Sequence, residues 1–259
     1  MREVLNTLPD FCKTFFRGIQ EYTSTRTRLA YAYDIRLFFE FLHGKNSICA
    51  KMEIEQYPLS LLDDITRLDI EEYLEYLTLY QKDGREITND ERGKARKLAS
   101  LRSFYNYFYQ NEMIENNPAS LVPLPKRPEK EIIRLEPNEV AILLDQVEAG
   151  AKLTEKELEY HKKTKLRDMA LMTLLLGTGI RVSECVGIDL SDVNFDEGGI
   201  KIRRKGGYET IIYFGEEVET ALLDYWEERE HIVPAEGHEN ALFLSLQNRR
   251  MAVRSVENL

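Results

Sequence analysis

Apolar side chains recur every three to four residues along most of this sequence, and this spacing changes to alternation with polar residues near residues 200–213. The first spacing lines one face of an α-helix, whereas alternation lines one face of a β-strand. Two short alternating segments flank the pair Gly206-Gly207, as the strands of a β-hairpin flank its turn. These periods predict a mostly α-helical protein with one small antiparallel sheet.

Several segments carry the helical period, and each begins or ends at a residue typical of a helix boundary. They cover residues 25–43, 70–80, 91–111, 136–149, 167–176 and 216–232. The polar segment 84–90 is predicted to be a loop. Phe104, Tyr105 and Phe108 lie at helical spacing, which favours a place in the core over a role as stacking platforms.

A segment rich in proline separates the two halves of the chain. It contains Pro123, Pro125 and Pro128. Proline lacks a backbone donor and disfavours helix in the residue before it, so an extended connector is predicted. We predict a helical domain over residues 1–120, a linker over 121–132 and a second domain over 133–259, in keeping with roughly two domains for this length.

Membrane proteins and disulfide-rich proteins are excluded by simple features of the sequence. No apolar run approaches the roughly 18–20 residues that span a bilayer, and the N-terminus has no signal-peptide pattern. Cys12, Cys49 and Cys185 are odd in number and far apart, which argues against both a disulfide framework and a zinc site. We predict a cytoplasmic protein without a metal or other cofactor.

The charge pattern permits a nucleic-acid partner without requiring one. The net charge of −10 counts against such a partner, but the distribution of the positive charge matters more than the total. Taken alone, any one basic cluster is equally typical of a solvated surface. The clusters are Arg26, Arg28 and Arg36; Arg92, Lys94, Arg96, Lys97 and Arg102; Lys162, Lys163, Lys165 and Arg167; and Lys201, Arg203, Arg204 and Lys205.

The block GTGIRVSE places an arginine directly after a glycine turn, at the start of a new helix. Residues three apart on a helix are neighbours, so Glu184 can hold the Arg181 guanidinium in one orientation. A planar guanidinium with fixed donors suits a pair of phosphate oxygens better than a flexible ammonium does. The alternative is an ordinary surface salt bridge, which contributes under about 1 kcal/mol to stability.

Three segments together resemble the Xer-type branch of the tyrosine recombinase (phage integrase-like) family. They are TRTRLAYAYDIRLFFEFL, RKLASLRSFYNYFYQNEMIENNPA, and LLLGTGIRVSECVGIDLSDVNF with the following IKIRRKGGYETIIYF. The third is the most specific, because GTGIRVSE is followed after about twenty residues by a basic hairpin. The resemblance implies a SAM-like helical core-binding domain and the front part of a mixed α+β catalytic domain.

The same resemblance implies a reaction in which a tyrosine hydroxyl attacks a DNA phosphodiester and forms a 3′-phosphotyrosyl link, with no cofactor. Arg181 would stabilise the charge on the phosphate, with Glu184 beside it. Lys205 at the hairpin tip matches the lysine that protonates the leaving 5′ oxygen. The neighbouring Arg203 and Arg204 leave an ambiguity of one or two residues in this assignment, and a turn lysine that serves solubility is the alternative.

Double-stranded DNA is the implied partner, bound as a homodimer or homotetramer in the full-length parent. The helix over 91–111 is the predicted groove-entering element, and the helix that begins at Thr25 would complete a clamp around the duplex. The sequence does not separate base contacts from phosphate contacts. The predicted DNA-binding residues are Thr25, Arg26, Arg28, Arg92, Lys94, Arg96, Lys97, Arg102, Arg203 and Arg204.

Part of the family's catalytic set has no counterpart in these residues. The second arginine normally belongs to a His-x-x-Arg block, yet none of the four histidines is followed by arginine three positions later. Tyr208, Tyr213 and Tyr225 lie before any place that the nucleophile could occupy. We therefore expect a C-terminally truncated chain that binds DNA without cleaving it. A non-catalytic protein that occupies recombination sites is the alternative, and a helical protein-interaction module is a third, disfavoured interpretation.

Overall fold

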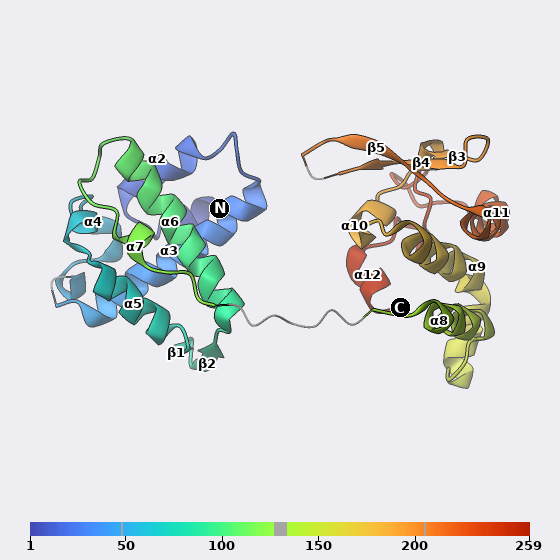
Figure 1. Ribbon diagram of the computed structural model, residues 1–259, viewed down its shortest axis with the longest axis horizontal. Coiled ribbons are helices and arrows are strands. Elements are labelled where there is room, and N and C mark those ends of the chain that lie inside the picture. Colours follow the sequence, from blue (N-terminus) through green and yellow to red (C-terminus); the bar gives the residue numbers. More distant parts are fainter. Residues whose placement is uncertain (48, 127–133, 205) are drawn as a thin grey trace. The chain divides into compact units, whose positions relative to one another are not determined.

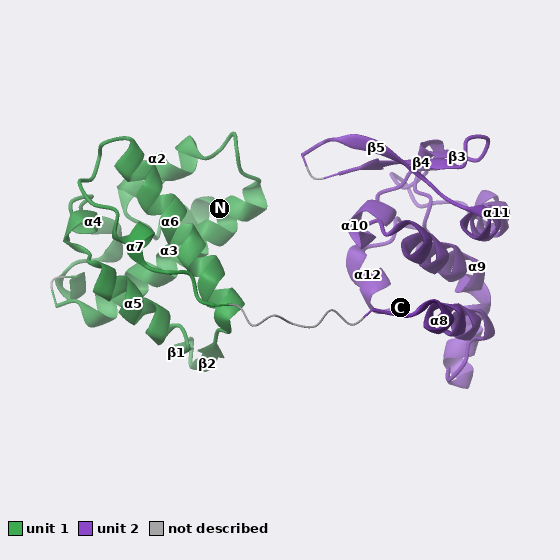
Figure 2. Cartoon of the chain, viewed as in Figure 1, with its two compact units in different colours: residues 1–131 green, residues 132–259 purple. Residues whose placement is uncertain are grey.

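The computed structural model describes residues 1–47, 49–126, 134–204 and 206–259. The chain divides into two compact units, residues 1–131 and 132–259, and each has its own hydrophobic core (Figures 1 and 2). Lys205 and residues 127–132 of the predicted linker lie outside the described residues. Among the described residues, no helix is long and apolar enough to cross a membrane.

Unit 1 is built from helices around an aromatic core. Ser24 and Thr66 accept backbone hydrogen bonds at the starts of two of them, and Asp90 does the same at the start of a third. The longest helices, α3 and α6, contact each other, and between them lie buried rings that include Phe38, Phe39 and Phe104. The helices are α1 (Arg2–Leu5), α2 (Asp10–Gly18), α3 (Thr25–Lys45), α4 (Leu61–Asp64), α5 (Arg67–Tyr76), α6 (Glu91–Gln110) and α7 (Pro118–Leu121), with 3-10 turns at Cys49–Lys51 and Ile54–Gln56.

Two predictions for the segment 70–90 of unit 1 are wrong. The segment 84–90 is not a loop throughout, because β1 (Leu79–Lys82) and β2 (Arg85–Thr88) form an antiparallel hairpin, and helix α5 ends before residue 80. Asp83 and Gly84 both have positive φ, at 52° and 74°. Asp-Gly is a strong signal for a two-residue hairpin turn, and the sequence interpretation missed it.

Unit 2 combines helices with a three-stranded antiparallel sheet of order β3-β4-β5. The predicted lysine- and glutamate-rich segment and the apolar helix after it are one continuous helix, α9, which a Thr154–Glu157 capping box begins and Gly179 ends at a φ of 66°. The elements are α8 (Pro137–Ala149), α9 (Glu155–Thr178), α10 (Val182–Cys185), a 3-10 turn (Leu190–Asp192), β3 (Val193–Asn194), β4 (Gly199–Arg203), β5 (Glu209–Tyr213), α11 (Glu216–Glu230) and α12 (Val253–Glu257).

The predicted hairpin is confirmed as β4 and β5, which pair Ile200 with Ile212 and Ile202 with Thr210. Ile200 and Ile202 are buried in the core of unit 2, whereas Ile211 and Tyr213 are exposed on the opposite face. Figure 1 shows the hairpin extending beyond the helices of its unit. The predicted fold class, mostly helical with a small antiparallel sheet, is confirmed, with β1–β2 as a second small sheet.

Candidate nucleic-acid interface

Arg181 and Glu184 form the ion pair that their spacing predicts. Arg181 directly precedes α10, and its Nη1 donates to Glu184 Oε1 at 2.8 Å while its backbone N–H donates to Oε2 at 2.9 Å. The Glu184 side chain is only 6% exposed, whereas that of Arg181 is 72% exposed. A buried carboxylate therefore fixes a guanidinium whose other N–H donors face solvent, unlike an ordinary surface pair in which both partners are exposed.

The surroundings of Glu184 keep its carboxylate charged. The Arg181 backbone N–H is the largest influence and lowers the pKa of Glu184; burial opposes it, and the Arg181 side chain and the charge of Arg204 lower the pKa further. A charged carboxylate orients the guanidinium more firmly than a neutral one. The influence of Arg204 also indicates that the base of the hairpin tip lies near this pair.

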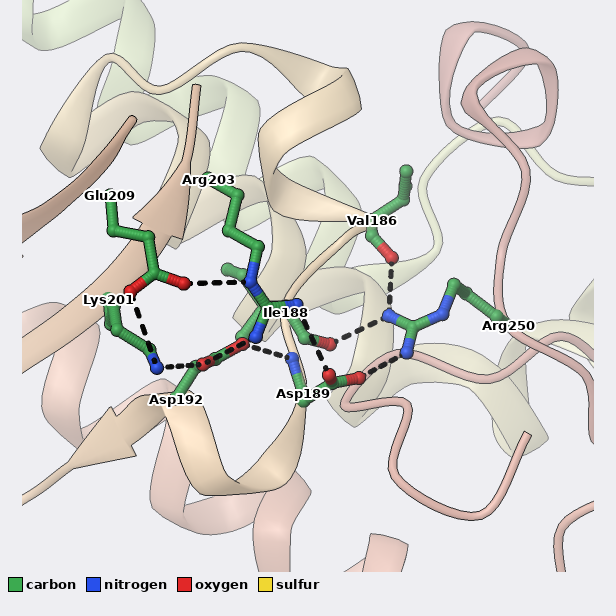
Figure 3. Close-up of polar contacts among 8 residues, drawn as sticks. All are labelled: Val186, Ile188, Asp189, Asp192, Lys201, Arg203, Glu209 and Arg250. Carbon is green, nitrogen blue, oxygen red and sulfur yellow. Dashed lines mark hydrogen bonds and ion pairs between the residues drawn. The ribbon is translucent and has the colours of Figure 1, made fainter. Parts of the chain in front are cut away.

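Arg203 and Arg204 are adjacent in sequence but differ in what surrounds them. Arg203 faces three carboxylates: Glu209 at 3.1 Å, Asp189 at 3.6 Å and Asp192 at 3.7 Å (Figure 3). Arg204 is exposed, and within the described part of the chain its side chain has no hydrogen-bond or ion-pair partner. Arg204 is therefore the more available cation for a phosphate. Lys205 lies outside the described residues.

A network of charges ties strands β4 and β5 to the segment after α10 (Figure 3). Lys201 lies 3.4 Å from Asp192 and 3.9 Å from Glu209. Arg250 bonds Asp189 and donates to the carbonyls of Val186 and Ile188 at 2.9 Å. The sequence interpretation missed these acids and Arg250, although two aspartates three residues apart just after GTGIRVSE are a signal in themselves.

Unit 1 contains a second arginine that a buried carboxylate holds. Arg96 Nη2 donates to Asp34 Oδ1 at 2.7 Å, Nη1 bonds Oδ2, and Ser100 Oγ donates to the same Oδ2 at 2.7 Å. The Asp34 side chain is 4% exposed and that of Arg96 is 52% exposed. The sequence interpretation missed Asp34, and the available signal was an acidic residue on the apolar face of a helix, where a charge requires a partner.

Several other predicted DNA-binding residues have side chains that bind within unit 1. Lys97 is buried and donates to Asn89 at 2.6 Å, and burial is the main reason that its pKa is lowered. Arg102 donates to the carbonyls of Ala119 and Val122. These contacts hold α6 to the segments next to it and leave fewer donors for a ligand.

At the starts of α3 and α6, some of the predicted DNA-binding residues bind other groups of unit 1 and others are exposed without a side-chain partner. Arg28 donates to the carbonyls of Gln20 and Thr23, at 2.7 and 2.8 Å, and also to Thr25 Oγ1; Lys94 pairs with Glu91. Arg26 and Arg92 are exposed, and no side-chain partner within the described ranges reaches either of them. Among the predicted residues, the structure thus presents two groups of exposed arginines. Arg26, Arg92 and Arg204 have no side-chain partner within the described ranges, whereas carboxylates hold Arg96, Arg181 and Arg203.

Comparisons with known proteins place this arrangement in a family. Residues 134–259 match the model of the phage integrase family. The tyrosine recombinase XerC of Caldanaerobacter subterraneus subsp. tengcongensis is 33% identical over 245 residues, which are 91% of this chain and 62% of that protein. The XerC of Anoxybacillus flavithermus is 30% identical over 243 residues, covering 93% of this chain and 71% of the relative.

Solved structures share the fold at low sequence identity. A lambda integrase (75–356) dimer bound to a COC′ core site matches with a TM-score of 0.62 and 14% identity, covering 95% of this chain and 76% of that one. XerH bound to a palindromic difH substrate, in a post-cleavage complex, matches with a TM-score of 0.61 and 16% identity over 95% and 69% of the two chains.

A helical unit followed by an α+β unit is the fold that this chain shares with the solved lambda integrase and XerH structures. The chain belongs to the tyrosine recombinase family, which is a class of enzymes. It spans 62% of the length of the first of these relatives and 71% of the second.

Proposed function

We propose that this chain binds duplex DNA through exposed arginines of both units, and that the whole protein recombines DNA at specific sites through a 3′-phosphotyrosyl intermediate. The observation that carries the proposal is the 72%-exposed Arg181 side chain on a 6%-exposed Glu184. A guanidinium fixed before the ligand arrives loses little freedom on binding and can stabilise charge that develops on a phosphate. Family membership and the resemblance of the GTGIRVSE block support the same conclusion.

In this proposal Arg181 contacts the phosphate that is attacked, and Glu184 is its positioning residue. The Arg181 donors that Glu184 leaves free point to solvent and would bond the non-bridging oxygens. Lys205 keeps its predicted role as the proton donor to the leaving 5′ oxygen. Its neighbour Arg204 lies near enough for its charge to lower the pKa of Glu184, which supports one shared site.

The predicted DNA-binding residues are expected to contribute unequally. Arg26, Arg92 and Arg204 would make the main phosphate contacts, because they are exposed and their side chains bind no other group among the described residues. The other predicted contacts are expected to have smaller effects, because each already binds another group of the protein. They are Thr25, Arg28, Lys94, Arg96, Lys97, Arg102 and Arg203.

We propose further that these 259 residues bind DNA without cleaving it. No histidine among them begins a His-x-x-Arg block. Tyr225 is buried and its hydroxyl donates to the Leu242 carbonyl at 3.1 Å, so it is not placed to attack a phosphate. The same observation supports the second candidate function, a protein that occupies recombination sites without catalysis.

A binding titration with a matched arginine control tests the proposal. The ligand is a fluorescein-labelled duplex of about three helical turns, titrated at several salt concentrations. Because a lost phosphate contact removes one unit of counterion release, Arg181→Ala should weaken binding and reduce the slope of log K against log salt by about one. Arg254→Ala is the control, since Arg254 also pairs with a glutamate three residues later but both partners are exposed.

Unchanged affinity in Arg181→Ala, or an equal loss in Arg254→Ala, would contradict the role given to Arg181. Incubation with a nicked suicide substrate, followed by denaturing electrophoresis, tests the second part. We expect no covalent protein–DNA adduct from residues 1–259. An adduct would show that a nucleophile is present among them.

A further inference from the structure

The tip of the β4–β5 hairpin carries a tyrosine that the proposed chemistry does not use. The Tyr208 side chain is 76% exposed, although tyrosine is an amphipathic residue that proteins more often bury in part. In the same unit Tyr225 of α11 is buried, and its hydroxyl donates to the Leu242 carbonyl. An exposed ring at the end of a protruding element (Figure 1) is a feature that the fold of unit 2 does not require.

The turn itself holds this ring in place. Gly206 and Gly207 have φ values of 95° and 82°, a region that residues with side chains rarely adopt. A Cβ atom on Gly206 would lie 3.2 Å from Cε2 and 3.3 Å from Cδ2 of Tyr208, so the ring rests against the bare backbone of Gly206. The Arg204 N–H donates to the Tyr208 carbonyl at 2.7 Å and closes the turn.

The turn also places Tyr208 opposite an arginine. Arg204 is exposed and its side chain has no partner among the residues described, while Tyr208 stands opposite it across the turn. An aromatic ring next to a guanidinium is the combination that contacts nucleic acids, because the cation meets the phosphate and the ring meets the apolar sugar and base surfaces. Tyrosine and arginine are also enriched at protein–protein interfaces. The run Arg203, Arg204 and Lys205 at this tip, however, places three positive charges side by side in the sequence, which favours a phosphate-bearing partner.

We propose that Tyr208 is a DNA-contacting residue, whose ring enters a groove of the duplex and packs against sugar and base edges while Arg204 binds the adjacent phosphate. This inference rests on the proposed function and deepens it. It assigns to the hairpin tip a contribution to affinity that does not depend on counterion release. In one binding experiment, loss of the Tyr208 ring should therefore lower the affinity without changing its salt dependence, whereas loss of the Arg204 charge should reduce the salt dependence.

Tyr213 supplies a control on the same strand. Its side chain is also exposed, at 68%, and it ends β5 opposite Gly199, at the base of the hairpin. Tyr213 lies five positions after Tyr208, which is about 16 Å along an extended chain. If Tyr208 acted through nonspecific hydrophobic adsorption or through hairpin stability, its replacement by alanine would lower DNA affinity as much as that of Tyr213. A specific contact at the tip predicts a loss for Tyr208 alone.

The experiment measures the affinity of the same labelled duplex, as a function of salt, for the wild type and for Tyr208→Ala, Tyr208→Phe, Tyr213→Ala and Arg204→Ala. We expect Tyr208→Ala to weaken binding at least about fivefold at every salt concentration with an unchanged salt slope. Tyr208→Phe and Tyr213→Ala should stay within about twofold of the wild type, and Arg204→Ala should lower the slope by about one. Circular dichroism melting confirms that each variant is folded.

Equal affinity of Tyr208→Ala and the wild type would overturn the inference, and so would equal losses in Tyr208→Ala and Tyr213→Ala. A change in self-association of Tyr208→Ala in analytical ultracentrifugation, with DNA affinity unchanged, would assign the ring to a protein contact instead. If the wild type failed to bind the duplex at any salt concentration, the proposed function itself would be wrong. If the wild type bound and Tyr208→Ala bound equally well, only the inference about Tyr208 would be wrong.

Discussion

Each unit of the molecule contains an exposed arginine bonded to a buried carboxylate, Arg96 in unit 1 and Arg181 in unit 2, and the two pairs are built in different ways. In unit 2 Glu184 lies three residues from Arg181 and accepts one side-chain bond from it. In unit 1 Asp34 lies 62 residues from Arg96 and accepts from both terminal nitrogens. The Arg181 side chain is 72% exposed, whereas the Arg96 side chain, both of whose terminal nitrogens bond Asp34, is 52% exposed.

The difference separates two uses of the same chemistry. A bidentate bond to a buried carboxylate between two helices stabilises the packing of those helices, and little of the guanidinium is left for a ligand. A single bond to a carboxylate in the next turn fixes the direction of the guanidinium and preserves donors for a phosphate. We therefore expect the Arg96 pair to matter more for stability and the Arg181 pair more for binding.

The largest expected effect on stability is that of Arg96→Ala. This change leaves the Asp34 carboxylate buried with only Ser100 as a donor, and removing one partner of a buried pair costs about 3 kcal/mol. Urea unfolding followed by circular dichroism measures the loss. Pairing the change with Asp34→Leu should recover much of the stability, because no unpaired charge then remains. If Arg96→Ala lowered the free energy of unfolding less than Arg181→Ala does, the Arg96 pair would not be the more important one for stability.

A smaller effect is expected from Glu184→Gln, and it should depend on pH. Because the folded state lowers the pKa of Glu184, the charged carboxylate adds stability above its unfolded pKa of about 4.3. That contribution disappears as the pH falls through the folded pKa. At neutral pH we expect Glu184→Gln to cost about 1 kcal/mol.

Urea unfolding at neutral pH and at successively lower pH values measures this effect. The stability difference between the wild type and Glu184→Gln should shrink as the pH falls below the unfolded value. A difference that stays constant over this range would show that the charge of Glu184 does not stabilise unit 2.

The smallest effect is expected from Arg254→Ala. Arg254 lies 3.6 Å from Glu257 in α12, with the same three-residue spacing as Arg181 and Glu184, but the two side chains are 81% and 50% exposed. Exposed pairs of this kind contribute about 0.3 kcal/mol. Unfolding and DNA titrations of this variant should both match the wild type. A loss as large as that of Arg181→Ala would mean that burial of the carboxylate is not what distinguishes the two pairs.

Local patterns in the sequence determined the helices, the β4–β5 hairpin and the contact between Arg181 and Glu184. These features depend on hydrogen bonds and side-chain spacings within a few residues, which a periodicity records directly. The β1–β2 hairpin was equally local, because the Asp83-Gly84 turn signals it, and it was missed only because its strands are short and polar.

Only the tertiary structure decided which basic residues remain available. The sequence placed Arg92, Arg96 and Lys97 in one cluster, but Asn89 binds Lys97, Asp34 binds Arg96, and Arg92 stays exposed. Likewise Arg203 meets Asp189 and Asp192 from another element, while its neighbour Arg204 does not. The partners lie on other elements of the chain, and their approach depends on how whole elements pack, which no spacing along one helix or strand contains.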